Sequence, residues 1–196
     1  MRTARLLAGL ALAVAVALAL AIGCARRDAE PEGNGAIVDM ELMAFLSEAR
    51  ALHHQANLRE EAGDLPGAAA SMDRLVHARR PHDGRTPEVE EVLADAYARL
   101  AEVELRQDAL DRAAAAVKAG LDHAPDATYF RGHLLEVEGL IMEARASTLA
   151  DAGRGDEARA ARDRAIALLE EVVRIQDQVI QRSLAAREAR AKEAGR

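Results

Sequence analysis

The chain contains few of the residues on which many folds and catalytic sites depend. It has one cysteine, no tryptophan and only 2% aromatic residues among its 196 residues. A single cysteine cannot form a disulfide within the chain. Valine and isoleucine never alternate with polar residues between turn dipeptides, so no strand is predicted. Most of the 50% hydrophobic residues are alanine and leucine. Because these residues favour helices, we expect an all-α protein.

Positive charge is also scarce. The net charge is −7, and 24 basic residues face 33 acidic ones after Gly23. An acidic surface repels the phosphates of nucleic acids, so a nucleic-acid partner is not expected.

Motifs of catalytic sites are missing as well. A phosphate-binding glycine loop needs a preceding strand, and none of the four serines lies in a nucleophile-elbow pattern. No H-E-x-x-H or Cys-His spacing occurs. We therefore predict neither an enzyme nor a cofactor or metal site. One alternative is a metal-binding helical bundle, in which His53 would meet acids of other helices, such as Glu102 or Glu143.

The first 24 residues have the pattern of an export signal. Residues 1–5 are basic, residues 6–22 are apolar and uncharged, and Gly23 precedes Cys24. Residues 21–24, Ala-Ile-Gly-Cys, resemble the lipobox of bacterial lipoproteins, although Ala21 replaces the usual leucine. The resemblance implies a signal peptide over 1–23 and an acylated Cys24 as the mature N-terminus. An ordinary cleaved signal or an uncleaved anchor is the alternative.

That resemblance also implies a cellular location. The protein would face the periplasm of a bacterial cell envelope on a lipid anchor, and Ala25 and Arg26 favour the outer over the inner membrane. Residues 24–36 mix charges with proline and glycine and show no apolar period. We expect a flexible tether there, followed by a helical domain over 37–196.

The helical domain has an internal repeat of 45 residues. Shifting the chain by that interval aligns its turns and its small residues. The aligned sets are Ala49, Ala94 and Gly139; Leu52, Tyr97 and Met142; Ala56, Ala101 and Ala146; Gly63, Asp108 and Gly153; Ala68, Ala113 and Ala158; Ala70, Ala115 and Ala160; Val76, Leu121 and Ile166. Small residues recur where two helices are expected to touch. Asp64, Thr86, Asp108 and Asp126 are the expected helix starts.

Each repeat resembles a tetratricopeptide (TPR) unit. The second unit shows this with Leu100, Ala101, Asp108, Ala113 and Pro125. The resemblance implies antiparallel hairpins stacked as a short α-solenoid, with units near 37–81, 86–125 and 127–170. The period is longer than the 34 residues of the family, and a plain antiparallel bundle is the alternative.

The same resemblance implies a concave surface that binds a protein or peptide partner. The ligand-facing positions of the family correspond to Arg50, His53, Asn57, Glu60, Asp95, Ala98, Glu102, Arg106, Glu143 and Ser147. Asn57 matches one residue of the carboxylate clamp of some TPR proteins. The lysines of that clamp are missing, so carboxylate clamping is not predicted. A solvated surface without a ligand is the alternative.

The last helix is expected to run from about Asp156 to Glu193 and to cap the stack. Its apolar residues cover about half of its circumference. A homodimer contact through Ile175 to Leu184 is the alternative role. Together, these patterns predict a lipid-anchored scaffold or adaptor of the cell envelope, with a structural homodimer as the second hypothesis.

Overall fold

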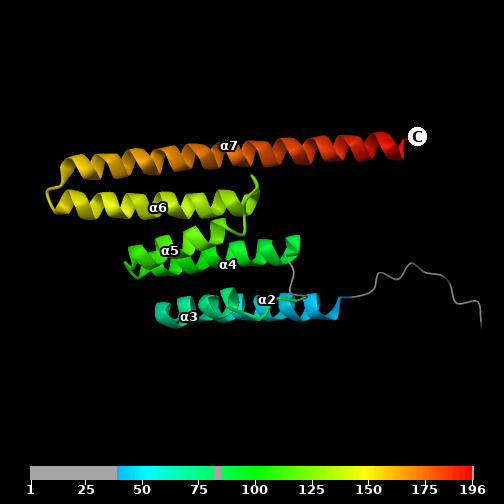
Figure 1. Ribbon diagram of the computed structural model, residues 1–196, viewed down its shortest axis with the longest axis horizontal. Coiled ribbons are helices and arrows are strands. Elements are labelled where there is room, and N and C mark those ends of the chain that lie inside the picture. The colour runs from blue at the N-terminus through cyan, green and yellow to red at the C-terminus, as the bar shows by residue number, and fades with distance from the viewer. Residues whose placement is uncertain (1–38, 82–84, 196) are drawn as a thin grey trace, which may run out of the picture. The chain divides into compact units, whose positions relative to one another are not determined.

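The computed structural model describes residues 39–81 and 85–195, in which α-helices predominate, Pro81 is in 3₁₀ conformation and no strand occurs. The lipobox, Cys24, the tether and Val38 lie outside the described residues. The helices are α2 (Met40–Glu61), α3 (Leu65–Val76), α4 (Pro87–Arg106), α5 (Leu110–Leu121), α6 (Tyr129–Asp151) and α7 (Gly155–Ala194). The expected all-α fold, with helical hairpins and a long last helix, is confirmed (Figure 1).

The helix ends inside the three hairpins repeat at intervals of 45 residues. The first helices end at Glu61, Arg106 and Asp151, and the second begin at Leu65, Leu110 and Gly155. Each turn contains one residue with positive φ: Gly63 at 78°, Asp108 at 57° and Gly153 at 73°. In all three turns, the backbone N–H of the next residue donates a hydrogen bond to the carbonyl five residues earlier. In the first turn, Asp64 N–H donates to the Arg59 carbonyl at 2.8 Å. The 45-residue repeat in the sequence therefore corresponds to the same helix C-cap at the end of the first helix of each hairpin.

Two of the four expected helix starts are observed. The Asp64 carboxylate accepts the Gly67 amide at 2.9 Å, and the Thr86 hydroxyl accepts the Val89 amide at 3.4 Å. Asp108 instead adopts the left-handed turn conformation, because its unit lacks glycine at that place. Asp126 is also not a cap: α6 begins after Thr128, whose hydroxyl accepts the Arg131 amide.

Small residues fill the inside of each hairpin. Ala56, Ala101 and Ala146 are at most 1% exposed, and so are Ala68, Ala113 and Ala158. Alanine leaves room for two backbones to approach closely. The expected contact at Ala70, Ala115 and Ala160 is wrong, because all three are exposed. Ala70 and Ala115 instead line a groove between α3 and α5, with Tyr97 and Leu100 of α4 in its wall.

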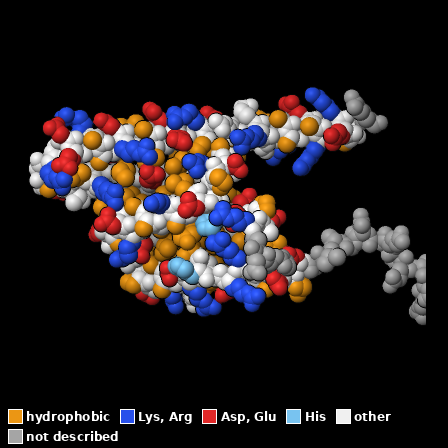
Figure 2. Space-filling model, viewed as in Figure 1, with side chains coloured by type: hydrophobic (Ala, Val, Ile, Leu, Met, Phe, Trp, Pro, Cys, Tyr) orange, Lys and Arg blue, Asp and Glu red, His pale blue; other side chains and the backbone are white. Residues whose placement is uncertain are grey.

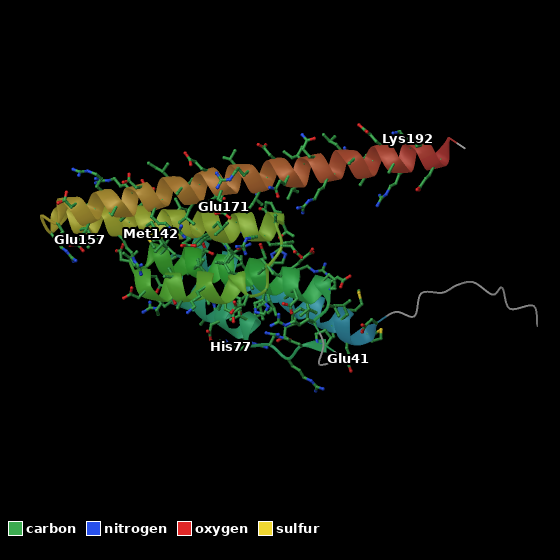
Figure 3. All side chains as sticks on the ribbon, turned by 45° about the horizontal axis from the view of Figure 1, so that its top comes forward. Glu41, His77, Met142, Glu157, Glu171 and Lys192 are labelled. Atoms are coloured by element: carbon green, nitrogen blue, oxygen red, sulfur yellow. The ribbon has the colours of Figure 1, made fainter. Side chains whose placement is uncertain are left out.

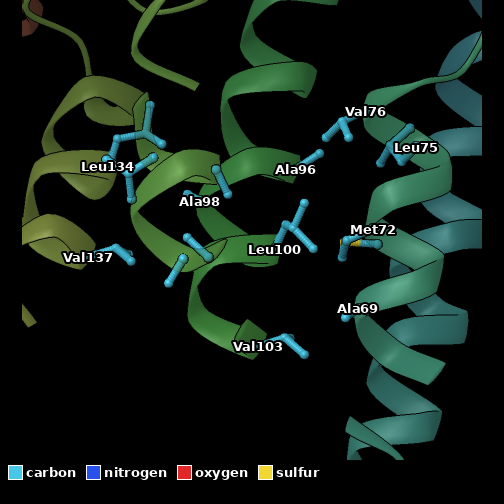
Figure 4. Packing of buried hydrophobic residues seen from close by; sticks show 14 of the residues in the cluster. Ala69, Met72, Leu75, Val76, Ala96, Ala98, Leu100, Val103, Leu134 and Val137 are labelled. Carbon is cyan, nitrogen blue, oxygen red and sulfur yellow. The ribbon is translucent and has the colours of Figure 1, made fainter. Parts of the chain in front are cut away.

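The hairpins stack through large apolar residues. α3 packs on both α2 and α4, and α5 packs on both α4 and α6. Figure 4 shows Met72 of α3 turned toward Leu100 of α4 and Val76 toward Ala96, with Leu134 of α6 on the other side of α4. Met72 and Leu134 are fully buried. This continuous core holds the first helices α2, α4 and α6 side by side.

The last helix differs from its counterparts in length and in packing. α7 has 40 residues, whereas α3 and α5 have 12 each. Among the described helices it packs on α6 alone, through Leu168 and Ile175 against Leu135. From Ile180 to Gly195 every residue is exposed, and α7 extends well past the end of α6 (Figure 1).

The repeated cap makes a stability prediction. Gly153→Ala should lower the free energy of unfolding by about 1 kcal/mol, because alanine at positive φ brings its Cβ against the following carbonyl. The control is Gly155→Ala, at the first residue of α7, where an added Cβ meets nothing within 4 Å. That change should be neutral or slightly stabilising. Chemical denaturation measures both, and equal losses would contradict the αL cap.

Candidate functional site

A row of polar side chains crosses the first helices of the three hairpins. On α2, His53, Asn57 and Glu60 follow spacings of four and three, so they share one face of the helix. On α4 the corresponding row is Asp95, Arg99, Glu102 and Arg106, and α6 adds His133. We call these eight residues the polar network. On the face seen in Figure 2, histidines lie among acidic and basic side chains, with hydrophobic side chains exposed between them.

Glu60 holds α2 to α4. Its side chain is only 9% exposed, and its two carboxylate oxygens accept from different arginines. Arg99 donates to Oε1 at 2.6 Å and Arg106 donates to Oε2. Arg99 also donates to Glu102 at 2.8 Å and reaches the Asn57 side-chain oxygen at 3.4 Å. Two charge-assisted hydrogen bonds compensate this nearly buried carboxylate for its lost hydration.

His133 extends the network to α6. Its Nε2 lies 3.0 Å from Glu102 Oε1, which is a hydrogen bond. Its Nδ1 is buried without a hydrogen-bond partner, and the nearest Asp95 oxygen is 4.0 Å away. On the other side of Asp95, His53 Nε2 lies 3.6 Å from Oδ2. Asp95 therefore lies between a histidine of α2 and a histidine of α6.

The pKa values of the two histidines are shifted in opposite directions. The hydrogen bond to Glu102 raises the pKa of His133 above 6.5, against the opposing effect of burial, and the charges of Glu102 and Asp95 add to it. Burial lowers the pKa of His53 and outweighs the attraction of Asp95, while Arg99 lowers it further. For Glu102, burial alone would raise the pKa, but the bonds from His133 and Arg99 bring it below its ordinary value.

A cavity of about 470 Å³ opens beside the network, between α2 and the start of α4. Leu46, Val92 and Phe130 give it apolar walls. Polar and charged side chains surround them: Arg50, His53, Glu88, Glu91 and Asp95. The cavity can therefore take an apolar group while its rim contacts a charged one.

The structure brings together most of the residues that the sequence predicted for a partner surface. His53, Asn57, Glu60, Asp95, Glu102 and Arg106 belong to the network, and Arg50 lines the cavity. Glu143 and Ser147 are exposed on α6 and lie outside both features. Ala98 is wrong as a ligand-facing position, because it is fully buried.

Sequence reasoning missed Arg99 and His133. Arg99 lies four residues after Asp95 and three before Glu102, so the helical period places it on the same face. No local signal identifies His133, because its hydrogen bond to Glu102 joins two residues that are 31 positions apart and lie on different helices.

Within residues 39–81 and 85–195, no group of three or more histidine, cysteine or acidic side chains is arranged to hold a metal ion. In the network, Glu60 is bonded to Arg99 and Arg106, and Glu102 to Arg99 and His133, while Asp95 lies 3.6 Å from His53. In the same part of the chain, no helix is long and apolar enough to cross a lipid bilayer.

Comparison of the chain with protein-family models, curated proteins and solved structures gives no significant match. The polar network and the cavity are therefore interpreted from their own chemistry.

The opposite pKa shifts predict opposite effects of pH on stability. His133 has a raised pKa, so its stabilisation is complete below about pH 6.5 and is lost as pH rises through its higher folded pKa. The loss of unfolding free energy in His133→Gln should therefore be larger at acidic than at alkaline pH. His53 has a lowered pKa, so it costs stability as pH falls below 6.5.

Chemical denaturation of His133→Gln and His53→Gln across this pH range measures both effects. Because the His133 effect requires Glu102, the double variant with Glu102→Gln should be less destabilised than the sum of the single changes. A pH-independent difference between wild type and His133→Gln would contradict the raised pKa.

Proposed function

We propose that the protein is a lipid-anchored scaffold or adaptor of the bacterial cell envelope. In this proposal, the face formed by α2, α4 and α6 binds a protein or peptide partner. The cavity beside the polar network carries the proposal, because it combines apolar walls with a charged rim on rigid helices.

The polar network supports this role by fixing the helices around the cavity. Its bonds connect α2 to α4 through Glu60 and α4 to α6 through His133. A surface that is already ordered loses less conformational entropy when a partner binds. We infer that the network orders the binding face and that the cavity beside it makes the contact.

The charges of the rim indicate the chemistry of the partner. Glu88, Glu91 and Asp95 give three acidic groups, against Arg50 and a histidine whose pKa is lowered. A segment with an apolar side chain next to a basic one fits this arrangement. The apolar group would enter beside Phe130, and the basic group would contact the acids at the rim.

The envelope location depends on the sequence before residue 38. Residues 21–24 resemble a lipobox, and the only cysteine is Cys24. An acylated Cys24 followed by a flexible tether would hold the helical domain near a membrane and leave its binding face accessible.

Charge reversal at the rim tests partner binding. Glu88→Lys with Glu91→Lys should weaken binding at least about tenfold, because lysines in place of these two exposed acids would repel a basic segment. The matched control is Asp73→Lys with Asp122→Lys, which changes the net charge equally at exposed sites outside this cavity. Cross-linking in the envelope followed by mass spectrometry measures recovery of the partner. Equal recovery from both variants would remove the cavity from the proposal.

Substitution of the cysteine tests the anchor separately. Cys24→Ser should abolish incorporation of labelled fatty acid and move the protein from the membrane to the soluble fraction, or leave it unprocessed. Ser183→Ala, at an exposed position of α7, serves as an unrelated control that keeps the cysteine. Unchanged labelling and membrane association of Cys24→Ser would refute lipidation at this residue.

A further inference from the structure

α7 carries two apolar stripes. The first, Ala165, Leu168, Val172, Ile175 and Val179, lies against α6 and is buried or half-buried. The second is exposed and consists of Ile166 (57%), Leu169 (41%), Val173 (61%), Ile180 (54%) and Leu184 (46%). At 100° per residue the two stripes lie roughly 110° apart on the helix. This is the pattern of a helix with neighbours on two sides, only one of which is present.

The first turns of α7 lack the apolar surface on which a further helical hairpin could stack. In α3, Ala69, Met72 and Val76 form the stacking surface toward α4 (Figure 4). One repeat later these positions are Ala114, Val117 and Leu121, which belong to the same core. In α7 they become Arg159, Arg162 and Ile166. The two arginines end the stacking surface, so the exposed stripe starts where the repeat pattern stops.

The charge along α7 changes sign near its middle. Residues 163–177 contain four acidic and two basic residues, whereas residues 178–192 contain four basic and one acidic residue. Figure 3 labels Glu171 in the first segment and Lys192 in the second. An antiparallel pair reversed about Ile175 places the acidic segment 163–177 beside residues 173–187, which contain three basic residues and one acidic residue. A parallel pair places the acidic segments side by side.

The spacing of the exposed stripe suits the same orientation. Reversing the helix about the level of Ile175 places Ile166 opposite Leu184, and Leu169 opposite Gln181, one residue from Ile180. This level is also the middle of α7, which runs from Gly155 to Ala194. Two reversed copies therefore overlap along their whole length, as a self-complementary two-fold contact requires.

We propose that α7 pairs with α7 of a second copy of this chain, antiparallel, through the exposed stripe. The exposed end of α7, from about residue 183 to Ala194, then lies along the first turns of the partner's α7. Helices α6 and α7 of both copies form a four-helix arrangement. Ile175 itself is 5% exposed and packs on α6, so the contact runs from Ile166 to Leu184 and not through Ile175. The pairing is independent of partner binding by α2, α4 and α6.

Sedimentation of the full-length protein in excess detergent tests the pairing. The wild type should be dimeric at micromolar concentration, and Val173→Glu with Ile180→Glu should weaken dimerisation at least about tenfold. Met43→Glu with Leu58→Glu is the matched control on α2, since these residues are 52% and 66% exposed. It should remain dimeric. Circular dichroism confirms that every variant is folded.

Cysteine cross-linking tests the orientation. Ile166→Cys with Leu184→Cys should give a covalent dimer on oxidation, whereas each single variant should not, because an antiparallel pair places position 166 opposite position 184. The wild-type chain is the control for cross-linking through Cys24. A monomeric wild type at high micromolar concentration, a dimer that survives Val173→Glu with Ile180→Glu, or cross-linking by single variants would overturn the proposal. So would a monomer that binds anionic vesicles through the stripe.

Discussion

The close approach of two helices at alanine is the constraint on which the rest of this domain depends. In each hairpin the fully buried alanines replace the large side chains that would hold the helices apart. With so little volume inside the hairpins, the larger residues Met72, Leu75, Leu93 and Leu134 form the contacts between neighbouring hairpins. The turn that permits the approach repeats its left-handed residue in all three units. The same combination of a left-handed turn residue and buried alanines therefore occurs in all three hairpins.

The stacking that follows from these hairpins creates the polar network. Because α2, α4 and α6 lie side by side, the acids and bases on their faces come within hydrogen-bond distance across helices. Glu60 is the central residue, since it is nearly buried and bonds to two arginines. Such bonds add orientation more than net stability, because the desolvation of the charges opposes their attraction. The cavity beside the network thereby has walls from helices held in one arrangement.

α7 serves the stack at one end and extends beyond it at the other. Its first turns carry Arg159 and Arg162 where the earlier units carry apolar residues, which prevents further stacking. Its later turns bury Leu168 and Ile175 against α6. The exposed stripe on the adjacent face gives the protein a second surface, separate from the face formed by the first helices. In the proposed role, these two surfaces would combine self-association with the binding of a different molecule.

The sequence by itself determined the helices, the 45-residue repeat and six of the eight network residues, because these depend on local periodicity and on turns close in the chain. It did not determine which aligned alanines are buried: Ala56 and Ala70 belong to equally regular sets, yet only Ala56 faces a helix. It also could not assign Asp108 to a left-handed turn, or His133 to Glu102. The tertiary structure decided these, because the orientation of each hairpin and the distances between helices arise only when large side chains from distant parts of the chain pack together.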